Sequence, residues 1–320
     1  MQQIIEIVVP VFAMIALGYG VARSGYLSAS AGDGIADFVF KVAVPLLLFR
    51  SLSQPDPAVS SGVLGALPFL LSYFSGVAVA WIVAMVLVAK VFGRGLRASV
   101  IGGVAASFSN LVLLGIPLIE RAFGAAGLQI LFTLIAVHLI TMMSTSTLLM
   151  EYAARHDGTT QSDFSPLKIL RRVMTNLAVN PIVIGIVCGL VFRWTGLPMP
   201  GLAATTIEAV AQTTAPLALF ALGMGLIKYG IAGNVVPAGL ITGLSLVVQP
   251  FVVFALGTWV LDLPLLTLQV AVLAAACPTG VNAYLFATYF GTAQGLSTNA
   301  IVLALLGSVV TLPLWLAVLV

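Results

Sequence analysis

Two interrupted apolar stretches decide the fold: ASFSNLVLLGIPLIERAFG over residues 106–124 and AAACPTGVNAYLFATYFG over residues 274–291. Each is long enough to form a helix, yet each carries asparagine, glycine and proline within it. Proline has no amide hydrogen and disfavours helix at the residue before it, so both stretches predict a helix that breaks partway along. Polar side chains accompany both interruptions, which makes these places the first candidates for a functional site.

The composition around the two stretches is typical of a membrane protein. Of 320 residues, 61% are hydrophobic and only 7% are charged, whereas a soluble domain has about 25% charged residues. One membrane-spanning helix needs about 20 mostly apolar residues. The composition therefore predicts an all-α polytopic membrane protein and leaves little of the chain for a soluble domain.

Apolar segments separated by polar or Gly/Pro joints predict ten membrane-spanning helices. They cover residues 3–22, 34–52, 64–90, 97–120, 126–152, 176–194, 201–228, 234–261, 264–290 and 296–319. One long hydrophilic loop, residues 153–175, lies between the fifth and the sixth span. The chain thus divides into two sets of five spans, residues 1–152 and 176–320.

The two sets of five spans align with each other. Several prolines, glycines and a phenylalanine of the first set recur as the same residue type 171 positions later in the second. They are Pro10, Gly18, Gly25, Pro45 and Phe49. The spacing falls to 169 at Pro68 and to 167 at Phe123, as shorter loops would produce. Because each set has an odd number of spans, the second enters the membrane from the opposite side, so we predict an inverted repeat, as in many secondary transporters.

Basic residues predict the orientation, because cytoplasmic loops of membrane proteins are enriched in lysine and arginine. If the spans alternate, the side of the central loop receives Arg23, Lys90, Arg94, Arg97, Arg155, Lys168, Arg171, Arg172 and Lys228. The other side receives Arg50, Arg121 and Arg193. We therefore expect the central loop in the cytoplasm and both termini outside. No basic segment precedes the first apolar run, so residues 1–22 are expected to be a retained span.

The two interruptions carry the candidate binding residues. Inverted symmetry would bring the broken helices together at the midplane of the bilayer, with backbone amides exposed at a half-helix N-terminus. Such amides suit an anion, and Asn110 and Asn282 add neutral hydrogen-bonding groups for a carboxylate. The alternative is that glycine and proline only permit close helix packing. The candidate helix-breaking or gating residues are Gly115, Pro117, Pro45 and Pro216.

Three of the ionisable side chains within the predicted spans are candidates for function. His138 is in the middle of an apolar span, where an ionisable residue is costly and is a candidate for function. The alternative is a structural histidine that is hydrogen-bonded to a neighbouring helix. Asp37 and Lys41 are four residues apart, so they share a helix face and can pair. They are either a proton or ion relay or a neutralised pair that limits the cost of burial.

Missing motifs argue against several other chemistries. None of the four lysines is followed by serine or threonine, so the chain has no nucleotide-binding P-loop, and it has neither HExxH nor GxSxG. Cys188 and Cys277 both lie in apolar stretches and imply neither a disulfide framework nor a metal cluster. We expect no enzymatic activity, no metal, no cofactor and no nucleic-acid partner.

The segments GIADFVFKVAVPLLLF, SNLVLLGIPL and PTGVNAYLFATYFG together resemble the auxin efflux carrier family, which includes plant PIN-type carriers and bacterial malonate-type transporters. The resemblance covers essentially the whole chain. It implies a fold similar to the sodium/bile-acid symporters, with spans 1, 2, 6 and 7 as a scaffold and spans 3–5 and 8–10 as a moving transport domain. It also implies a homodimer and, for a bacterial member, the inner membrane.

The resemblance also implies site residues. The family's substrate contacts correspond to Asn110, next to Ser109, in the first break. In the second break they correspond to Pro278, Thr279, Gly280 and Val281. His138 falls where plant carriers have a glutamine near the substrate. The chain departs from the plant pattern at Ser109 and Asn282, which replace prolines, and at Leu48, which replaces a serine, so auxin itself is not the expected substrate.

The sequence thus predicts a secondary transporter that moves a small organic anion, a mono- or dicarboxylate, by alternating access of the elevator type. Coupling to H⁺ or Na⁺ stays open. A sodium-coupled symporter would bind cations at the same crossing through freed carbonyls, although the scarcity of buried acids weighs against it. A non-transporting sensor, which would usually carry a signalling domain, and an anion channel, for which no filter motif is recognisable, are the alternatives from other classes.

Overall fold

The computed structural model describes residues 2–53, 65–158, 171, 174–175, 177–229 and 233–319. Throughout these residues the regular structure is helical, apart from one isolated antiparallel bridge between Ser109 and Thr279. Short π-helical segments (η1, η2, η3 and η5) and one 3-10 segment (η4) adjoin the α-helices. The fold is therefore all-α.

The helices of the first half precede the central loop. They are α1 (Gln2–Arg23), α2 (Ala29–Phe38), η1 (Val39–Ala43), α3 (Val44–Ser53), α5 (Leu67–Val86), η2 (Leu87–Val91), α6 (Leu96–Ser107), η3 (Leu111–Gly115) and α7 (Ile116–His156). The helices of the second half follow it. They are α9 (Pro181–Thr195), α10 (Gly201–Ala211), α11 (Thr214–Gly225), η4 (Leu226–Lys228), α12 (Val235–Gly243), η5 (Leu244–Val248), α13 (Gln249–Trp259), α14 (Leu265–Ala276), α15 (Asn282–Tyr289) and α16 (Gln294–Leu319).

Six helical stretches of the described chain are long and apolar enough to cross a membrane. They are Gln2–Arg23, Leu67–Val91, Leu111–His156, Gly201–Lys228, Val235–Trp259 and Gln294–Leu319. Large apolar side chains such as Leu71, Ile82 and Val310 lie on the outside of these stretches, where lipid rather than water would cover them. These features are those of a multi-pass membrane protein.

Six long helical stretches stand against ten predicted spans because several of the predicted spans are interrupted or merged in the structure. The predicted span 34–52 consists of α2, η1 and α3 in succession, and the span 264–290 consists of α14 and α15 with a break between them. The predicted spans 97–120 and 126–152 meet within α7, which turns at Gly124 with φ 61° and ψ −152°, a conformation open mainly to glycine. The central loop 153–175 and the first residues of the spans that begin at 64 and 176 lie partly outside the described residues.

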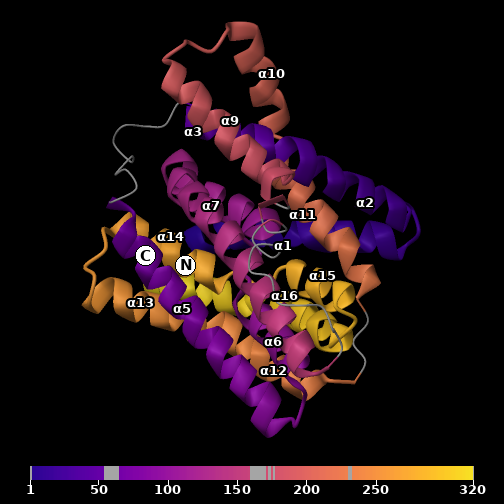
Figure 1. The fold of residues 1–320 in the computed structure, drawn as a ribbon. Helices are drawn as coiled ribbons and strands as arrows, with labels where there is room; N and C mark the ends of the chain where they lie inside the picture. Colours follow the sequence, from indigo (N-terminus) through magenta and orange to yellow (C-terminus); the bar gives the residue numbers. More distant parts are fainter. Residues whose placement is uncertain are drawn as a thin grey trace.

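One group of helices packs backbone against backbone (Figure 1). In this group α1 lies along α11, and α3 lies along α9. A Cβ atom on Gly18 would lie 2.2 Å from the carbonyl oxygen of Phe220, and one on Gly189 would lie 2.9 Å from that of Phe49. Glycine is therefore required at both contacts. These glycines and phenylalanines are the residues that recur at a spacing of 171 positions.

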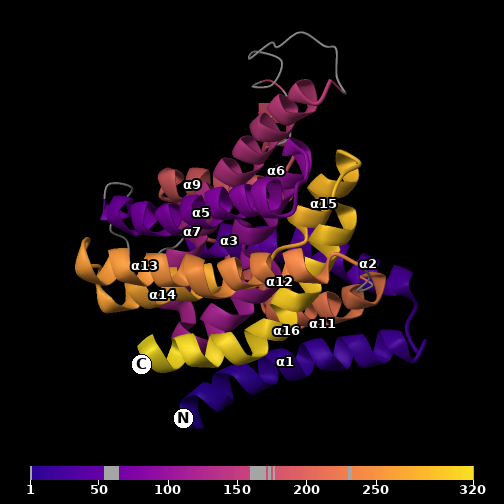
Figure 2. The same ribbon diagram turned by 90° about the horizontal axis from the view of Figure 1, so that it is seen from below.

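The other helices pack around the short helices α6 and α14. Both are enclosed on all sides over most of their length, with residues 99–107 and 270–276 buried. Around them α5 contacts α6 and α13, α13 contacts α14, and α12 contacts α16. Figure 2 shows α13 and α14 running side by side and α16 next to α1, with the two chain termini close together. The buried ends of α6 and α14 are where the chain departs from helix.

Candidate functional site

Two broken helices meet at their breaks. Regular helix ends at Ser107 in α6 and at Ala276 in α14, and it resumes at Leu111 and Asn282. The Asn110 N–H donates to the Pro278 carbonyl at 2.8 Å, and the Gly280 N–H donates to the Phe108 carbonyl at 2.8 Å. The two breaks thus form a short antiparallel pair, which we call the crossing (residues 108–110 and 277–281).

The Thr279 hydroxyl closes the end of α6. It donates to the Ala105 carbonyl at 2.7 Å, and Thr279 is buried. In a continuous helix this carbonyl would accept a hydrogen bond from the Ser109 N–H. That N–H donates instead to the Ser107 carbonyl at 3.1 Å. Helix ends leave such carbonyls without partners. A side chain from the second broken helix therefore satisfies the backbone of the first.

Asn110 has both a structural role and a free donor. It is buried, and its Oδ1 atom caps η3 by accepting from the Leu113 N–H at 3.1 Å. Its Nδ2 group makes no hydrogen bond within the described chain. One end of the amide thus holds the restarted helix, while the other end is left to donate to a ligand.

The start of α15 offers further donors. The backbone N–H groups of Thr279, Val281 and Asn282 make no hydrogen bond to any described residue, as is usual in the first turn of a helix. Val281 and Asn282 are half-buried, whereas Pro278, Thr279 and Gly280 are buried. Partly free N–H groups at a helix N-terminus attract negative charge. The crossing and Asn282, the first residue of α15, therefore combine neutral donors from both broken helices.

His138 of α7 lies directly behind the first break. Its ring is 4.9 Å from the Phe108 ring, edge to face, and Tyr73 and Phe74 of α5 surround it. The Tyr73 hydroxyl lies 3.3 Å from Nδ1 of His138. Nε2 is buried and has no partner among the described residues. The structure thus places His138 one side chain away from the crossing.

Two buried polar residues at the site were missed by reasoning from the sequence. Gln249, at the start of α13, is fully buried, and its Nε2 group lies 3.4 Å from the Ser109 hydroxyl. Tyr73 of α5 is also fully buried, and its hydroxyl contacts His138. A glutamine followed by proline inside the apolar segment 234–261 was a usable signal for Gln249. Tyr73 gave none, because a single tyrosine is common in membrane helices.

The pair of Asp37 and Lys41 lies away from this site. The two side chains form an ion pair at 2.7 Å, so the predicted pairing is present. Their side chains are 65% and 62% exposed, however, whereas residues 108–110 and 277–280 of the crossing are buried. The structure therefore does not bring this pair into the crossing.

The candidate helix-breaking residues have different positions. Gly115 ends the π-helical segment η3, and Pro117 lies in the first turn of α7, where a missing N–H is tolerated. The departure from helix is centred on residues 108–110, upstream of both. Pro45 and Pro216 lie in α3 and α11, outside the two breaks. Pro45 instead packs against Gly185 of α9, where a Cβ atom would lie 2.5 Å from the Pro45 carbonyl oxygen.

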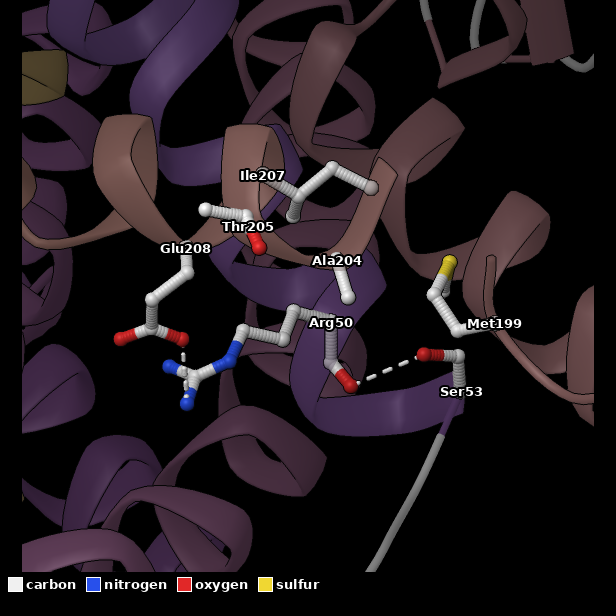
Figure 3. A pocket seen from close by; sticks show the side chains of 7 residues that line it. All are labelled: Arg50, Ser53, Met199, Ala204, Thr205, Ile207 and Glu208. Carbon is white, nitrogen blue, oxygen red and sulfur yellow. Dashed lines mark hydrogen bonds and ion pairs between the residues drawn. The ribbon is translucent and has the colours of Figure 1, made fainter. Parts of the chain in front are cut away.

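A separate cavity of about 380 Å³ lies between the end of α3 and α10 (Figure 3). It is lined by Arg50, Ser53, Met199, Ala204, Thr205, Ile207 and Glu208. Arg50 and Glu208 face each other and pair at 2.5 Å. Both are partly exposed, and such pairs are worth only about 0–1 kcal/mol. None of the lining residues belongs to the crossing.

Known proteins similar to this chain are membrane transporters. The family model described as "Membrane transport protein" matches residues 3–316. An uncharacterized transporter of Methanothermobacter thermautotrophicus is 28% identical over 319 residues, which cover 98% of each chain. A Rhizobium meliloti protein named "Putative malonate transporter" is 25% identical, with 97% of this chain and 94% of that protein covered. Auxin efflux carrier component 8 of Arabidopsis thaliana is 25% identical, with 98% and 96% covered.

Proposed function

We propose a substrate class and a mechanism for this chain, which belongs to the auxin efflux carrier family of membrane transport proteins. The chain is a membrane transporter and not an enzyme. We propose that its substrate is a small organic anion, a mono- or dicarboxylate. The names of two relatives, one for malonate and one for auxin, support a carboxylate.

The crossing carries this proposal. A buried site that offers the Asn110 Nδ2 group and the free N–H groups of residues 279, 281 and 282 can hold a carboxylate through neutral donors. Such donors compensate the anion's charge without a buried cation, whose own desolvation would be costly. In this proposal Ser109, Pro278 and Gly280 shape the site, and His138 tunes its selectivity or carries a proton.

We propose that transport follows an elevator-type alternating access between two inverted repeats, residues 1–152 and 176–320. The reciprocal contacts of Gly18 with Phe220 and of Gly189 with Phe49 support the repeat, since each pair is the other shifted by 171 positions. The packing of α1 with α11 and of α3 with α9 supports a scaffold of spans 1, 2, 6 and 7. Spans 3–5 and 8–10 would then move and expose the crossing to each side in turn.

The cellular arrangement completes the proposal. We place the protein in the inner membrane of a bacterial cell as a homodimer, with the central loop in the cytoplasm and both termini outside. The excess of basic residues on the side of the central loop supports this orientation. Neither a cofactor nor a nucleic acid takes part, and the coupling ion is H⁺, Na⁺ or none.

Transport assays with proteoliposomes test the substrate class. Currents on a solid-supported membrane are recorded for a panel of mono- and dicarboxylates, with and without sodium or a pH gradient. We expect a saturable response to one carboxylate and its loss in Asn110→Ala and Asn282→Ala, with expression retained. If the panel is silent, counterflow of labelled malonate detects electroneutral exchange. Normal transport by both asparagine variants would overturn the assignment of the site.

Two further variants separate binding from helix capping at Asn110. Asn110→Asp keeps the capping oxygen but replaces the donor with a negative charge, so we expect a folded protein that does not bind the anion. Asn180 caps α9 in the same way, with its Oδ1 accepting from the Ile182 N–H at 2.9 Å. Asn180→Ala therefore loses a cap, worth about 1 kcal/mol, and should transport normally. Equal losses in Asn180→Ala and Asn110→Ala would mean that Asn110 acts through capping alone.

A further inference from the structure

We propose that Gln249 is a positioning residue for the crossing: it fixes Ser109 and, through its backbone, the geometry of the carboxylate site. This inference rests on the proposed function. Ser109 is the residue whose neighbours make the two hydrogen bonds of the crossing, the Phe108 carbonyl and the Asn110 N–H. Whatever holds Ser109 therefore also places the donors of Asn110 relative to α15.

Gln249 reaches Ser109 from the start of α13. It follows the π-helical segment η5 (Leu244–Val248) and opens α13. Such wide turns within α-helices occur frequently at functional sites. The Gln249 side chain is fully buried and its Nε2 lies 3.4 Å from the Ser109 hydroxyl, although the two residues are 140 positions apart.

A second group of side chains contacts the neighbouring residue of the break. The Phe108 ring lies 4.9 Å from the His138 ring, edge to face, and the Tyr73 hydroxyl lies 3.3 Å from the His138 Nδ1 atom. Neither of these contacts involves Ser109. Among the side-chain hydrogen bonds of the described residues, the one made by the Ser109 hydroxyl is with Gln249.

The close contact of α5 with α13 forms a fixed support for the Gln249 side chain. A Cβ atom on Gly76 would lie 2.8 Å from the Gln249 carbonyl oxygen and 2.6 Å from Val253 Cγ2, so the helices approach as closely as glycine permits. One turn away, the Ser72 hydroxyl donates to the Val253 carbonyl at 2.9 Å. The backbone that carries Gln249 is therefore itself held in place.

A packing role alone does not account for Gln249. Its Oε1 atom is buried and has no hydrogen-bond partner among the described residues, as is also true of His138 Nε2. A buried polar atom without a partner is destabilising, and an apolar side chain of similar shape would avoid that cost. The contact with Ser109 is the interaction that the glutamine provides and that leucine or methionine would not.

Hydrogen–deuterium exchange tests the positioning without any substrate. Peptides that cover residues 105–113 and 276–284 are followed in the purified full-length protein and in Gln249→Leu. We expect exchange in both peptides to rise about fivefold or more in this variant. Ser308→Ala is the control, because it removes a buried hydroxyl that bonds the Leu305 carbonyl of its own helix, α16, and not Ser109; it should leave both peptides unchanged. Unchanged exchange in Gln249→Leu would overturn the inference.

Counterflow of labelled malonate tests the consequence for the substrate. Gln249→Leu should raise the KM about fivefold or more and change Vmax less than twofold. The reason is that the hydrogen-bond donors of the carboxylate site are displaced, while the helices that move during transport are intact. In a Ser109→Ala background, Gln249→Leu should add nothing further, since it acts through Ser109. Additive losses would instead show that Gln249 contributes by packing. If the wild type does not take up malonate, malonate is not its substrate. The hydrogen–deuterium exchange measurement still decides whether Gln249 positions the crossing.

Discussion

At the scale of single residues, the crossing depends on side chains that complete the backbone of another helix. The Thr279 hydroxyl is the partner of the Ala105 carbonyl, which the break of α6 deprives of its helical N–H. Thr279→Val keeps the shape and removes this bond, so we expect a loss of about 1–2 kcal/mol in the free energy of unfolding. Unfolding of the purified protein in detergent, followed by denaturant titration, measures the loss.

Thr279→Ser is the matched control for this prediction. Serine keeps the hydroxyl and removes only a methyl group, so most of the stability should return. A Thr279→Val protein as stable as the wild type, or a Thr279→Ser protein as unstable as Thr279→Val, would show that the hydroxyl does not hold the end of α6.

At the scale of whole elements, glycine sets the distance between α1 and α11. A Cβ atom on Gly223 of α11 would lie 2.0 Å from the Ile15 carbonyl oxygen of α1, a backbone atom that cannot rotate away. Gly223→Ala therefore forces the helices apart, and overpacking of this kind costs about 1–3 kcal/mol or more. We expect a lower Tm of the purified protein and a lower yield of monodisperse protein.

The last residue of the same helix provides the control. A Cβ atom on Gly225 would have no neighbour within 4 Å, and alanine favours helix over glycine by about 1 kcal/mol. Gly225→Ala should therefore leave the Tm unchanged or raise it slightly. Equal destabilisation by the two substitutions would mean that helix propensity or expression, rather than the contact with α1, causes the effect.

At the scale of the whole molecule, the proposed orientation can be read by cysteine labelling. Trp194 at the end of α9 is 90% exposed and lies on the proposed outer side, whereas Lys90 at the end of the predicted span 64–90 is exposed on the proposed cytoplasmic side. In a Cys188→Ser background, a membrane-impermeant maleimide should label Trp194→Cys in intact cells. Lys90→Cys should react only after the membrane is opened.

Cys277 serves as an internal control in these cells. It is a fully buried residue of the crossing, so it should stay unlabelled in both conditions. Labelling of Lys90→Cys, and not of Trp194→Cys, in intact cells would reverse the orientation. Labelling of both would contradict the assignment of the two positions to opposite sides.

The sequence by itself determined the features that depend on composition and local backbone chemistry. Apolar length identifies a membrane protein, and proline, glycine and asparagine indicate breaks within residues 106–124 and 274–291, because these residues act on their own stretch of backbone. The ion pair of Asp37 and Lys41 was predictable for the same reason, since four residues is one helical turn. Placing the first break at residues 108–110 rather than near Gly115 already required the structure.

Only the tertiary structure decided which distant groups meet. Thr279 and Ala105 are 174 positions apart, and Gln249 and Ser109 are 140 apart, so no local pattern pairs them. It also decided that the Asn110 oxygen caps η3 while its nitrogen stays free, and that Asp37 and Lys41 lie outside the crossing. The physical reason is that such contacts follow from how whole helices pack, where a glycine such as Gly76 fixes the approach of two backbones and so selects the side chains that touch.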